Sequence, residues 1–440
     1  MSRRAVPGDA RPACPTHPAG PRRVTIVSAG VGAGHDGAAD ALGAQLEEAG
    51  FQVDRHDFLD LLPARLGRVL SGTYHRLLTA APSGYERIYA ATERSGSPGP
   101  VVRALFRSAE LRMLRAIGPQ SQAVVSTYPG ASQVLGALRR SGRLGIPALT
   151  YLTDFSVHPL WVAPGIDAHL AAHPVPAAQA EALGAARVLV TGPVTAARFA
   201  AVTEPDRWAA RDDFGLPHDV PLALLVAGSW GVGPVRESAA EIWDSGAAEP
   251  VVVCGRNTAL AEQLRADGFR YVHEWVRDMP LLMRACDVLV QNAGGLTSIE
   301  AFASGLPVAS YRCIPGHGQT NAVALDEAGL AAWIREPEDL ASVLTGLLGG
   351  PLGERQRAAG LALFSSGASP VAAITAVATP AELPVATRRP QLPHRTTKLA
   401  AAALAAAVSL GIAAPLAHAY ESDPGRLSTA AHRLIERYEL

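Results

Sequence analysis

The feature that most constrains the fold is the alternation of short apolar runs with helical stretches along most of the chain. A first series runs from VTIVSA (24–29) through QAVVST and PALTYLT to ARVLVTG, which ends at residue 192. A second series begins at PLALLVAG (221–228) and continues through EPVVVCG, RYVHEWV, CDVLVQNAGG and LPVASY. Strands that alternate with helices in this way form parallel sheets with right-handed crossovers. The sequence therefore predicts an α/β protein with two Rossmann-like domains that face each other across a cleft.

Length and composition agree with this organisation. A chain of 440 residues exceeds what one hydrophobic core usually supports, and its 48% hydrophobic content is typical of a globular protein. We expect a disordered arm at 1–21, an N-terminal domain at 22–195 and a C-terminal domain at 196–375. The formal net charge of −1 gives no reason to expect nucleic acid as a partner. The four cysteines are far apart and lack ligand spacing, which argues against a zinc site or disulfide scaffold and fits a cytosolic compartment.

The C-terminal zone differs from the rest. Residues 376–398 form a Pro-rich, basic linker, 399–420 carry no charge, and 421–440 form a polar tail. The uncharged stretch is long enough to cross a bilayer as a transmembrane helix, and the basic residues before it would keep the main body in the cytoplasm. Because alanine makes it only weakly hydrophobic, an Ala-rich helix packed on the protein and a signal-like relic remain alternatives. We therefore expect the protein on the cytoplasmic face of the cell membrane, either peripheral or anchored.

The first glycine-rich turn, SAGVGAGHDGAAD (28–40), lies between a strand and a helix. Gly32 and Gly34 allow the backbone to approach a ligand closely, and the helix N-terminus offers free N–H groups. His35 follows at the carboxyl edge of a parallel sheet, where ligands of α/β proteins bind. Its imidazole suits proton abstraction near neutral pH, although a histidine that only caps the helix would give the same pattern.

The second turn, VAGSWGVGP (226–234), repeats the arrangement of strand, glycine turn and helix. Its backbone amides and one hydroxyl can surround a phosphate, from Gly228, Ser229, Gly231 and Gly233. One such turn in each domain suggests that two ligands meet in the cleft. Asp54 lies near the spacing that a dinucleotide enzyme requires, but the first turn does not match GxGxxG, so a dehydrogenase is the weaker interpretation.

The third motif, QNAGGLTSIEAFASGLPVASYRCIPGHGQTNA (291–322), again ends a strand in glycines and opens a helix. A carboxylate at this helix start can accept both hydroxyls of a ribose, and hydroxyl side chains can donate to phosphate. An acid that only complements the helix dipole is the alternative for this carboxylate. Two amides after the next strand could reach a sugar. The residues concerned are Gly294, Gly295, Thr297, Ser298, Glu300, Gln319 and Asn321.

These motifs together resemble a known family. SAGVGAGH, TDFSVHPLW, VLVTGP, AGSWGVGP and QNAGGLTSIEAFASGLPV are similar to the diacylglycerol glycosyltransferases, of the monogalactosyldiacylglycerol synthase and processive diacylglycerol glucosyltransferase type. Those enzymes are related to the N-acetylglucosaminyl transferase that makes lipid II. The resemblance covers residues 23 to 348 and implies a GT-B fold, with the acceptor bound by the first domain and a UDP-sugar by the second. It also implies inverting chemistry that needs no metal and no cofactor beyond the UDP-sugar donor.

The resemblance also implies roles for single residues. His35 would be the catalytic base, Glu300 would hold the ribose, and Val276 would offer its backbone to the uracil. Gln319 would contact the donor hexose. Residues on the acceptor side would be Gly32, Gly34, Tyr85, Asp154 and His158, because the last two match the family's TDxxxH stretch and Tyr85 lies in the matching TYHRLLTAAPSGYERIY. No DxD triplet occurs in the sequence, so a metal clamp of that style is not expected.

The stretch from Arg65 to Arg115 favours a lipid acceptor. It carries nine arginines, at 65, 68, 76, 87, 94, 103, 107, 112 and 115, against three glutamates, with Tyr74, Tyr85, Tyr89 and Phe106 interleaved. Positive charge beside aromatic residues suits a protein that rests on anionic headgroups, whereas a solvated helix face is the alternative.

The sequence therefore predicts transfer of a hexose from a UDP-sugar to diacylglycerol or a related lipid. A lipid-linked UDP-N-acetylglucosamine transferase of cell-wall synthesis is a second enzyme hypothesis. A GT-B protein that binds nucleotide or lipid without turnover is a third.

Overall fold

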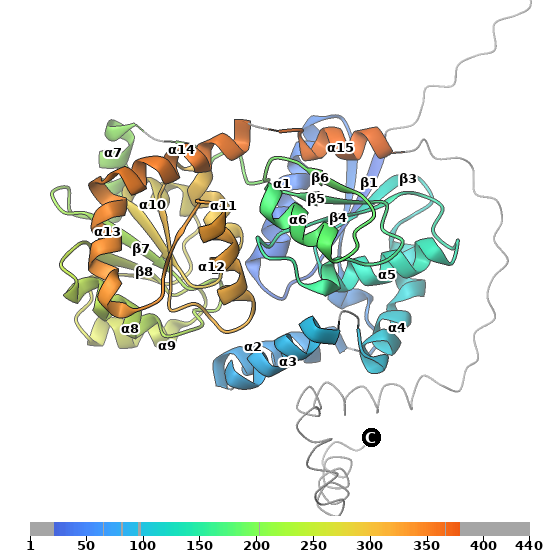
Figure 1. The fold of residues 1–440 in the computed structure, drawn as a ribbon, viewed down its shortest axis with the longest axis horizontal. Coiled ribbons are helices and arrows are strands. Elements are labelled where there is room, and N and C mark those ends of the chain that lie inside the picture. Colours follow the sequence, from blue (N-terminus) through green and yellow to red (C-terminus); the bar gives the residue numbers. More distant parts are fainter. Residues whose placement is uncertain are drawn as a thin grey trace, which may run out of the picture.

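The computed structural model describes residues 22–378, except 65, 81, 96–97, 202 and 366. Within this range the chain forms two six-stranded parallel sheets, each covered by helices, and the two halves lie side by side (Figure 1). The prediction of two α/β domains with parallel sheets is confirmed. The arm, most of the linker, the proposed membrane span at 399–420 and the polar tail lie outside the described residues.

The first domain contains the strand order β2-β1-β3-β4-β5-β6. Its strands are β1 (Arg23–Ser28), β2 (Gln52–Asp57), β3 (Ser121–Ser126), β4 (Ala148–Tyr151), β5 (Ala168–Ala171) and β6 (Val188–Val190). Its helices are α1 (Ala33–Glu48), η1 (Phe58–Leu61), α2 (Leu66–Ala80), α3 (Pro82–Ser95), α4 (Pro100–Ala116), α5 (Pro129–Arg140), η2 (Pro159–Trp161) and α6 (Pro174–Ala182).

The second domain contains the strand order β12-β11-β10-β7-β8-β9. Its strands are β7 (Leu222–Val226), β8 (Glu249–Val253), β9 (Tyr271–His273), β10 (Val288–Gln291), β11 (Val308–Tyr311) and β12 (Ala332–Ile334). The helices from this part of the chain are α7 (Glu204–Phe214), α8 (Val235–Asp244), α9 (Thr258–Ala266), α10 (Met279–Ala285), α11 (Leu296–Ala303), α12 (His317–Glu327), η3 (Pro337–Asp339), α13 (Leu340–Gly349), α14 (Pro351–Ser365) and α15 (Pro370–Val377).

Each sheet is buried on both faces, which is why its central strands read as continuous apolar runs. In the first domain Val24 and Ile26 pack on one side, with Leu42 of α1, and Val27 packs on the other. In the second domain the alternate residues of β7 divide in the same way between two clusters. The carboxyl ends of both sheets are therefore held rigidly, and the loops that leave them start from fixed positions.

The end of the described chain returns to the first domain. Helix α14 spans from the second domain towards the first, and α15 lies on the first (Figure 1). Ile374 of α15 is completely buried in the cluster that contains Val24 and Ile26. A single bridge between Thr191 and Ala368 joins the two connections between the domains. The range 196–375 expected for the C-terminal domain thus includes a helix that packs on the N-terminal one.

Helices α2 and α3 form a hairpin that leaves the first domain and runs below the second domain in Figure 1. Leu78 and Tyr85 of the hairpin pack with Val232 and Ile314 of the second domain in one small apolar cluster. The hairpin therefore connects the two domains at one side of the cleft.

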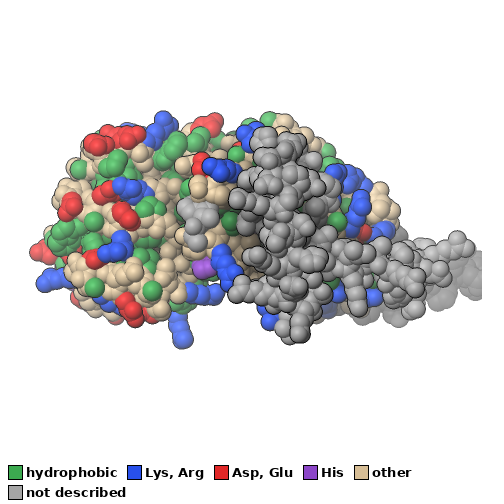
Figure 2. All heavy atoms as spheres, turned by 90° about the horizontal axis from the view of Figure 1, so that it is seen from below, with side chains coloured by type: hydrophobic (Ala, Val, Ile, Leu, Met, Phe, Trp, Pro, Cys, Tyr) green, Lys and Arg blue, Asp and Glu red, His purple; other side chains and the backbone are tan. Residues whose placement is uncertain are grey.

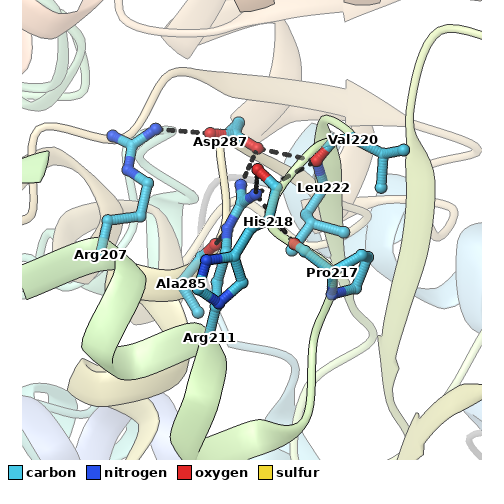
Figure 3. Close-up of polar contacts among 8 residues, drawn as sticks. All are labelled: Arg207, Arg211, Pro217, His218, Val220, Leu222, Ala285 and Asp287. Atoms are coloured by element: carbon cyan, nitrogen blue, oxygen red, sulfur yellow. Dashed lines mark hydrogen bonds and ion pairs between the residues drawn. The ribbon is translucent and has the colours of Figure 1, made fainter.

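A buried ion pair fixes the start of the second domain (Figure 3). Arg211 of α7 contacts Asp287 at 2.6 Å, with side-chain exposures of 5% and 15%. Arg207 donates to the other carboxylate oxygen at 2.5 Å, and the backbone N–H of Leu222 donates to Asp287 at 2.8 Å. The Arg211 guanidinium also donates to four backbone carbonyls, those of Ala285, Pro217, His218 and Val220. Because every contact lies at the amino edge of the sheet, this cluster is structural and remote from the cleft.

Candidate functional site in the interdomain cleft

The starts of helices α1 and α11 meet between the domains. A side chain added at Gly37 would come within 2.3 Å of Leu296 Cδ2, and one at Gly34 would lie 4.0 Å from Leu296 Cβ. A small cavity between these helices is lined from both domains, by Gly34, Thr153 and Asp154 on one side and Leu296 and Ile299 on the other. The first and third sequence motifs therefore come together between the domains, and glycine in α1 permits the close approach.

His35 lies in the first turn of α1 at this meeting point. Its Nδ1 is 3.1 Å from the Thr153 hydroxyl oxygen, which comes from the loop after β4. The rings of Tyr128 and Trp161 lie against the imidazole, with centroids at 5.3 Å and 5.9 Å. Thr127 donates a hydrogen bond to the His35 carbonyl at 3.1 Å. No described residue is hydrogen-bonded to Nε2 of His35, so this nitrogen is available to a ligand.

Asp154 and His158, the matches to TDxxxH, lie in the segment after β4 that also carries Thr153. Asp154 accepts a hydrogen bond from the Trp161 indole at 3.2 Å. His158 Nδ1 accepts from the backbone N–H of Leu160 at 3.2 Å, and its Nε2 is 3.1 Å from the Thr92 hydroxyl of α3. Burial lowers the pKa of His158, so it is a neutral hydrogen-bonding residue at neutral pH. These contacts connect the loop after β4 to the α2–α3 hairpin.

The donor-side glycine turn after β7 has a backbone that only glycine adopts easily. Gly231 has φ of 58°, and a Cβ there would lie 2.5 Å from the Cys254 carbonyl oxygen. Gly233 has φ of 103° and a Cβ there would lie 2.6 Å from Asn292 Nδ2. Ser229 accepts the N–H of Arg256 through its carbonyl, at 2.9 Å. The loops after β8 and β10 thus hold this turn in place, and Gly228 at its tip is exposed.

The helix start at α11 carries polar groups without protein partners. Gly294, with φ of 74°, donates to the Gln291 side chain, and Gly295 caps the helix beside Thr297. Ser298 is completely buried, and within the described residues its hydroxyl oxygen has no hydrogen-bond partner. An unpaired buried hydroxyl costs free energy, and a ligand would relieve that cost.

Glu300, one turn into α11, is a partly buried carboxylate. Burial raises its pKa to about 8, and the positive charge of Arg198 only partly counteracts this. In the described part of the chain no residue donates a hydrogen bond to its carboxylate. A carboxylate in such surroundings can accept hydrogen bonds from a ligand's hydroxyl groups, as predicted for a ribose.

The two side-chain amides after β11, those of Gln319 and Asn321, differ in burial. Gln319 is exposed on α12, and its predicted contact with the hexose stays a prediction, as does the uracil contact of the half-buried Val276. Asn321 is completely buried: its Oδ1 accepts from the Ser156 N–H at 2.8 Å, and its Nδ2 donates to the Ala293 carbonyl at 2.9 Å. Its amide therefore joins the domains and has no free group for the sugar that the sequence suggested.

Three residues that the sequence did not single out as site residues also lie where the domains meet: Thr153, His317 and Trp230. His317 begins α12, and its Nδ1 is 2.9 Å from the Tyr85 hydroxyl. Burial lowers the pKa of His317, as does His35, while the charge of Asp154 raises it. Trp230 of the donor turn contacts Tyr74 and His75 of α2, at centroid distances of 5.9 Å and 4.9 Å. The sequence held one signal for His317, a histidine directly after the PG pair that follows β11. No local pattern indicated the residues that His317 and Trp230 contact.

The basic stretch is divided by the structure into two faces. The eight described arginines from Arg68 to Arg115 are all exposed, and blue Lys and Arg side chains stand near the middle of the face on which α2 and α3 lie (Figure 2). The aromatic residues do not share this surface. Tyr74, Tyr85 and Tyr89 pack against the second domain, and Phe106 packs against Phe58. The three tyrosines are thus buried between the domains and Phe106 within the first domain, although we expected all four beside the arginines.

Two absences concern only the described part of the chain. No helix between residues 22 and 378 combines the length and apolar character that a membrane crossing requires. Nor do three or more His, Cys, Asp or Glu side chains gather there in a way that could hold a metal ion.

Comparisons with known proteins bear on the fold and the class of this chain. The family described as monogalactosyldiacylglycerol (MGDG) synthase matches residues 35–194. A processive diacylglycerol beta-glucosyltransferase of Bacillus subtilis is 26% identical over 337 residues, which cover 74% of this chain and 87% of that protein. The solved structure of TcCGT1 in complex with UDP aligns with a TM-score of 0.52 and 12% identity, over 78% of this chain and 94% of that one. Phytolacca americana UGT2, complexed with UDP-2fluoro-glucose and pterostilbene, aligns with a TM-score of 0.50 and 13% identity, over 81% and 98%.

The fold and these matches define the class: the chain is a glycosyltransferase with the GT-B fold. The predicted resemblance to the diacylglycerol glycosyltransferases is confirmed, both by the family match and by the similarity to the Bacillus subtilis protein.

Proposed function

We propose that this chain is a hexosyltransferase that moves a hexose from a UDP-sugar to diacylglycerol or a related membrane lipid, with inversion at the anomeric carbon. The observation that carries the proposal is the meeting of two helix starts: the first turn of α1, which carries His35, lies against the start of α11 in the second domain, and Gly34 and Leu296 line one small cavity there. The names of its relatives support the lipid acceptor and a glucosyl or galactosyl group.

In this proposal His35 removes the proton from the acceptor hydroxyl. The hydroxyl oxygen attacks the anomeric carbon from the face opposite the diphosphate, and the bond from that carbon to the UDP oxygen breaks. The electron pair leaves with UDP. Inversion follows because one displacement occurs, with the base and the leaving group on opposite sides of the sugar. The absence of a hydrogen-bond partner at Nε2 of His35 among the described residues supports this role.

The second domain would hold the donor through groups that lack protein partners. The free N–H groups at the start of α11 and in the turn from Gly228 to Gly233 suit the diphosphate, because helix starts carry partial positive charge. Ser298 would donate to the same phosphates. Glu300 would accept the two ribose hydroxyls, which would supply the hydrogen bonds that the protein does not.

The acceptor side would meet the membrane through the exposed arginines of α2, α3 and α4. Arginines on a protein surface attract anionic headgroups, with about 1 kcal/mol for each residue near the surface. A protein bound in this way on the cytoplasmic face would present its hairpin, and hence the cleft beside it, to the lipid. The segment 399–420 would add an anchor.

The decisive experiment is a screen of donors and acceptors followed by product mass measurement. UDP-glucose, UDP-galactose and UDP-N-acetylglucosamine would compete for transfer to extracted lipids, with diacylglycerol and a polyprenyl-diphosphate lipid as separate acceptors. A hexosyl-diacylglycerol product supports the proposal. An aminosugar on the polyprenyl lipid would support the cell-wall hypothesis, and UDP binding without UDP release would support a protein without turnover.

His35→Ala tests the base. Loss of a positioned general base typically lowers kcat by about 10²–10⁴-fold, while UDP binding should persist. His218→Ala is the matched control, because His218 is an exposed histidine at the amino edge of the second sheet, where its ring bonds to Asp212 and only its backbone carbonyl contacts Arg211. Near-normal transfer by folded His35→Ala would remove this histidine from the mechanism.

Vesicle sedimentation tests the membrane contact. Replacing Arg68, Arg76 and Arg87 with Gln should weaken binding to anionic vesicles on the order of a hundredfold, more at low salt than at high salt. The same replacement at Arg270, Arg335 and Arg355, exposed arginines of the second domain, is the charge-matched control. Equal binding by both triple variants would contradict the assigned face. A chain ended at Pro384 that still sediments would show that the anchor is not required.

A further inference from the structure

Thr153 lies where it can control which nitrogen of His35 is free. It follows β4 by two residues, in the loop at the carboxyl edge of the first sheet. Its Oγ1 is 3.1 Å from Nδ1 of His35, and it lines the same cavity as Leu296. The side chain is therefore part of the site and touches the ring directly.

The contact can be made in two ways, which have opposite chemical consequences. A neutral imidazole has one N–H and one lone pair, whereas a hydroxyl both donates and accepts. If Nδ1–H donates to Thr153, the lone pair is on Nε2 and can take a proton. If the hydroxyl donates to Nδ1, then Nε2 carries the hydrogen and cannot act as a base. Only the first arrangement agrees with a base that works through its unbonded nitrogen.

Among the described residues the ring has no other hydrogen-bond partner that could make this choice. The adjacent carboxylate, Asp154, accepts from the indole of Trp161 at 3.2 Å. Tyr128 and Trp161 contact the imidazole through their ring edges and faces, which restrict its rotation without selecting a tautomer. Thr153 is thus the one described side chain that forms a hydrogen bond with the imidazole.

We propose that Thr153 is a positioning residue for the base: its hydroxyl accepts the Nδ1 proton of His35 and fixes the tautomer whose Nε2 receives the proton of the acceptor hydroxyl. This inference rests on the proposed function, since it gives Thr153 a role only if His35 is the base. The Nδ1–H bond is made before and after proton transfer, so the ring keeps its orientation throughout the reaction. Histidines in active sites generally have one defined tautomer because a hydrogen bond to one ring nitrogen fixes which nitrogen carries the proton.

Thr153→Val, which keeps the shape and removes the hydroxyl, is the first test. We expect kcat to fall about tenfold, the size associated with one lost hydrogen bond, and the KM for the UDP-sugar to stay within about twofold. Thr153→Ser should restore kcat to within about twofold of the wild type, because serine supplies the same oxygen. A kcat of Thr153→Val equal to that of the wild type would overturn the proposal, and so would a failure of Thr153→Ser to exceed Thr153→Val.

Thr25→Val is the matched control. Thr25 makes a buried hydroxyl contact of 2.7 Å with Ser121 in the same sheet, away from the cleft. It should lower stability as Thr153→Val does without lowering kcat. A matched loss of kcat in both variants would mean that reduced stability alone explains the effect.

The tautomer itself can be observed on the full chain labelled with ¹⁵N-histidine. The His35 signals are assigned by their absence in His35→Ala, and long-range ¹H–¹⁵N correlations at a pH where the ring is neutral report which nitrogen carries the hydrogen. We expect Nδ1–H in the wild type and in Thr153→Ser, and a mixture in Thr153→Val. Nε2–H in the wild type would refute the inference. If His35→Ala retains transfer, the proposed function fails instead, whatever Thr153→Val does.

Discussion

Glu300→Gln is expected to remove the pH dependence of UDP binding, because the wild-type carboxyl titrates within the range in which binding is measured. Burial raises its pKa to about 8. With that value, about one tenth of the free protein carries the carboxylate at pH 7, and about three quarters does so at pH 8.5. If the carboxylate is the form that accepts the two ribose hydroxyls, UDP affinity should rise about eightfold over this interval.

The sign of the stability effect follows from the same shift. The folded protein holds the Glu300 proton more tightly than the unfolded chain, whose pKa is near the ordinary value of 4.5. Glu300 therefore destabilises the unliganded fold progressively as the pH rises from that value through about 8, by an amount on the order of a few kcal/mol. Glu300→Gln removes the charge but keeps the shape. It should be more stable than the wild type at pH 8.5 and similar to it at pH 5.

Calorimetry of UDP binding provides the assay. At pH 7, binding to the wild type should release about 0.9 proton, so the observed enthalpy will differ between buffers of different ionisation enthalpy. Glu300→Gln should bind more weakly, with no proton release from this site, and 2′-deoxy-UDP should show a smaller pH effect with the wild type. Wild-type affinity that is flat from pH 7 to 8.5, with no proton release, would refute the assignment of the ionised carboxylate to the ribose.

Three further perturbations follow from the geometry. Asp287→Asn leaves the buried Arg211 and the half-buried Arg207 without their counter-charge. It should lower the free energy of unfolding by about 3–5 kcal/mol in urea denaturation, with kcat unchanged at low temperature, and an unchanged midpoint would contradict the structural role. Gly231→Ala forces a Cβ to 2.5 Å from a backbone oxygen, so the KM for the UDP-sugar should rise severalfold. Gly246→Ala, with a similar φ but open space around it, should leave that KM unaltered. Tyr85→Phe removes the hydroxyl that lies 2.9 Å from His317 Nδ1 and should reduce kcat/KM for the acceptor by about fivefold. A kcat/KM equal to that of the wild type would exclude a contribution from this bond.

The sequence predicted the parts of the site that depend on local chemistry. A glycine turn between a strand and a helix was predicted at 226–234, and the structure has this turn between β7 and α8, with positive φ at Gly231 and Gly233. His35 was expected at a sheet edge because it directly follows a strand and a glycine turn, and it lies there. Such features are encoded within a few residues, so a periodic pattern and a turn motif are sufficient to find them.

Partners that lie far apart in the sequence were not predictable in this way. The hydroxyl of Tyr85 contacts His317, which is 232 positions away in the sequence. No pattern within α3 predicts which surface packs against the apolar face of this helix. The aromatic residues were therefore interpreted as a membrane face although they pack against the second domain. The same difficulty affected α12, where successive side chains turn by about 100°. Gln319 is exposed for this reason, while His317, two positions earlier and on the opposite side of the helix, faces the hairpin.

Two contacts set the position of His35 relative to the second domain, and each one joins the neighbourhood of His35 to that domain. Leu296 packs against the glycines of α1 and lies one turn before Glu300 in α11. Ser156 lies three residues after Thr153 and is held by Asn321 of α12. Neither contact involves the turn at 228–233. It follows that the distance between His35 and Glu300 depends on the packing of two helix starts and one buried amide. The turn at 228–233 reaches the first domain separately, because its Val232 and Trp230 pack against the α2–α3 hairpin.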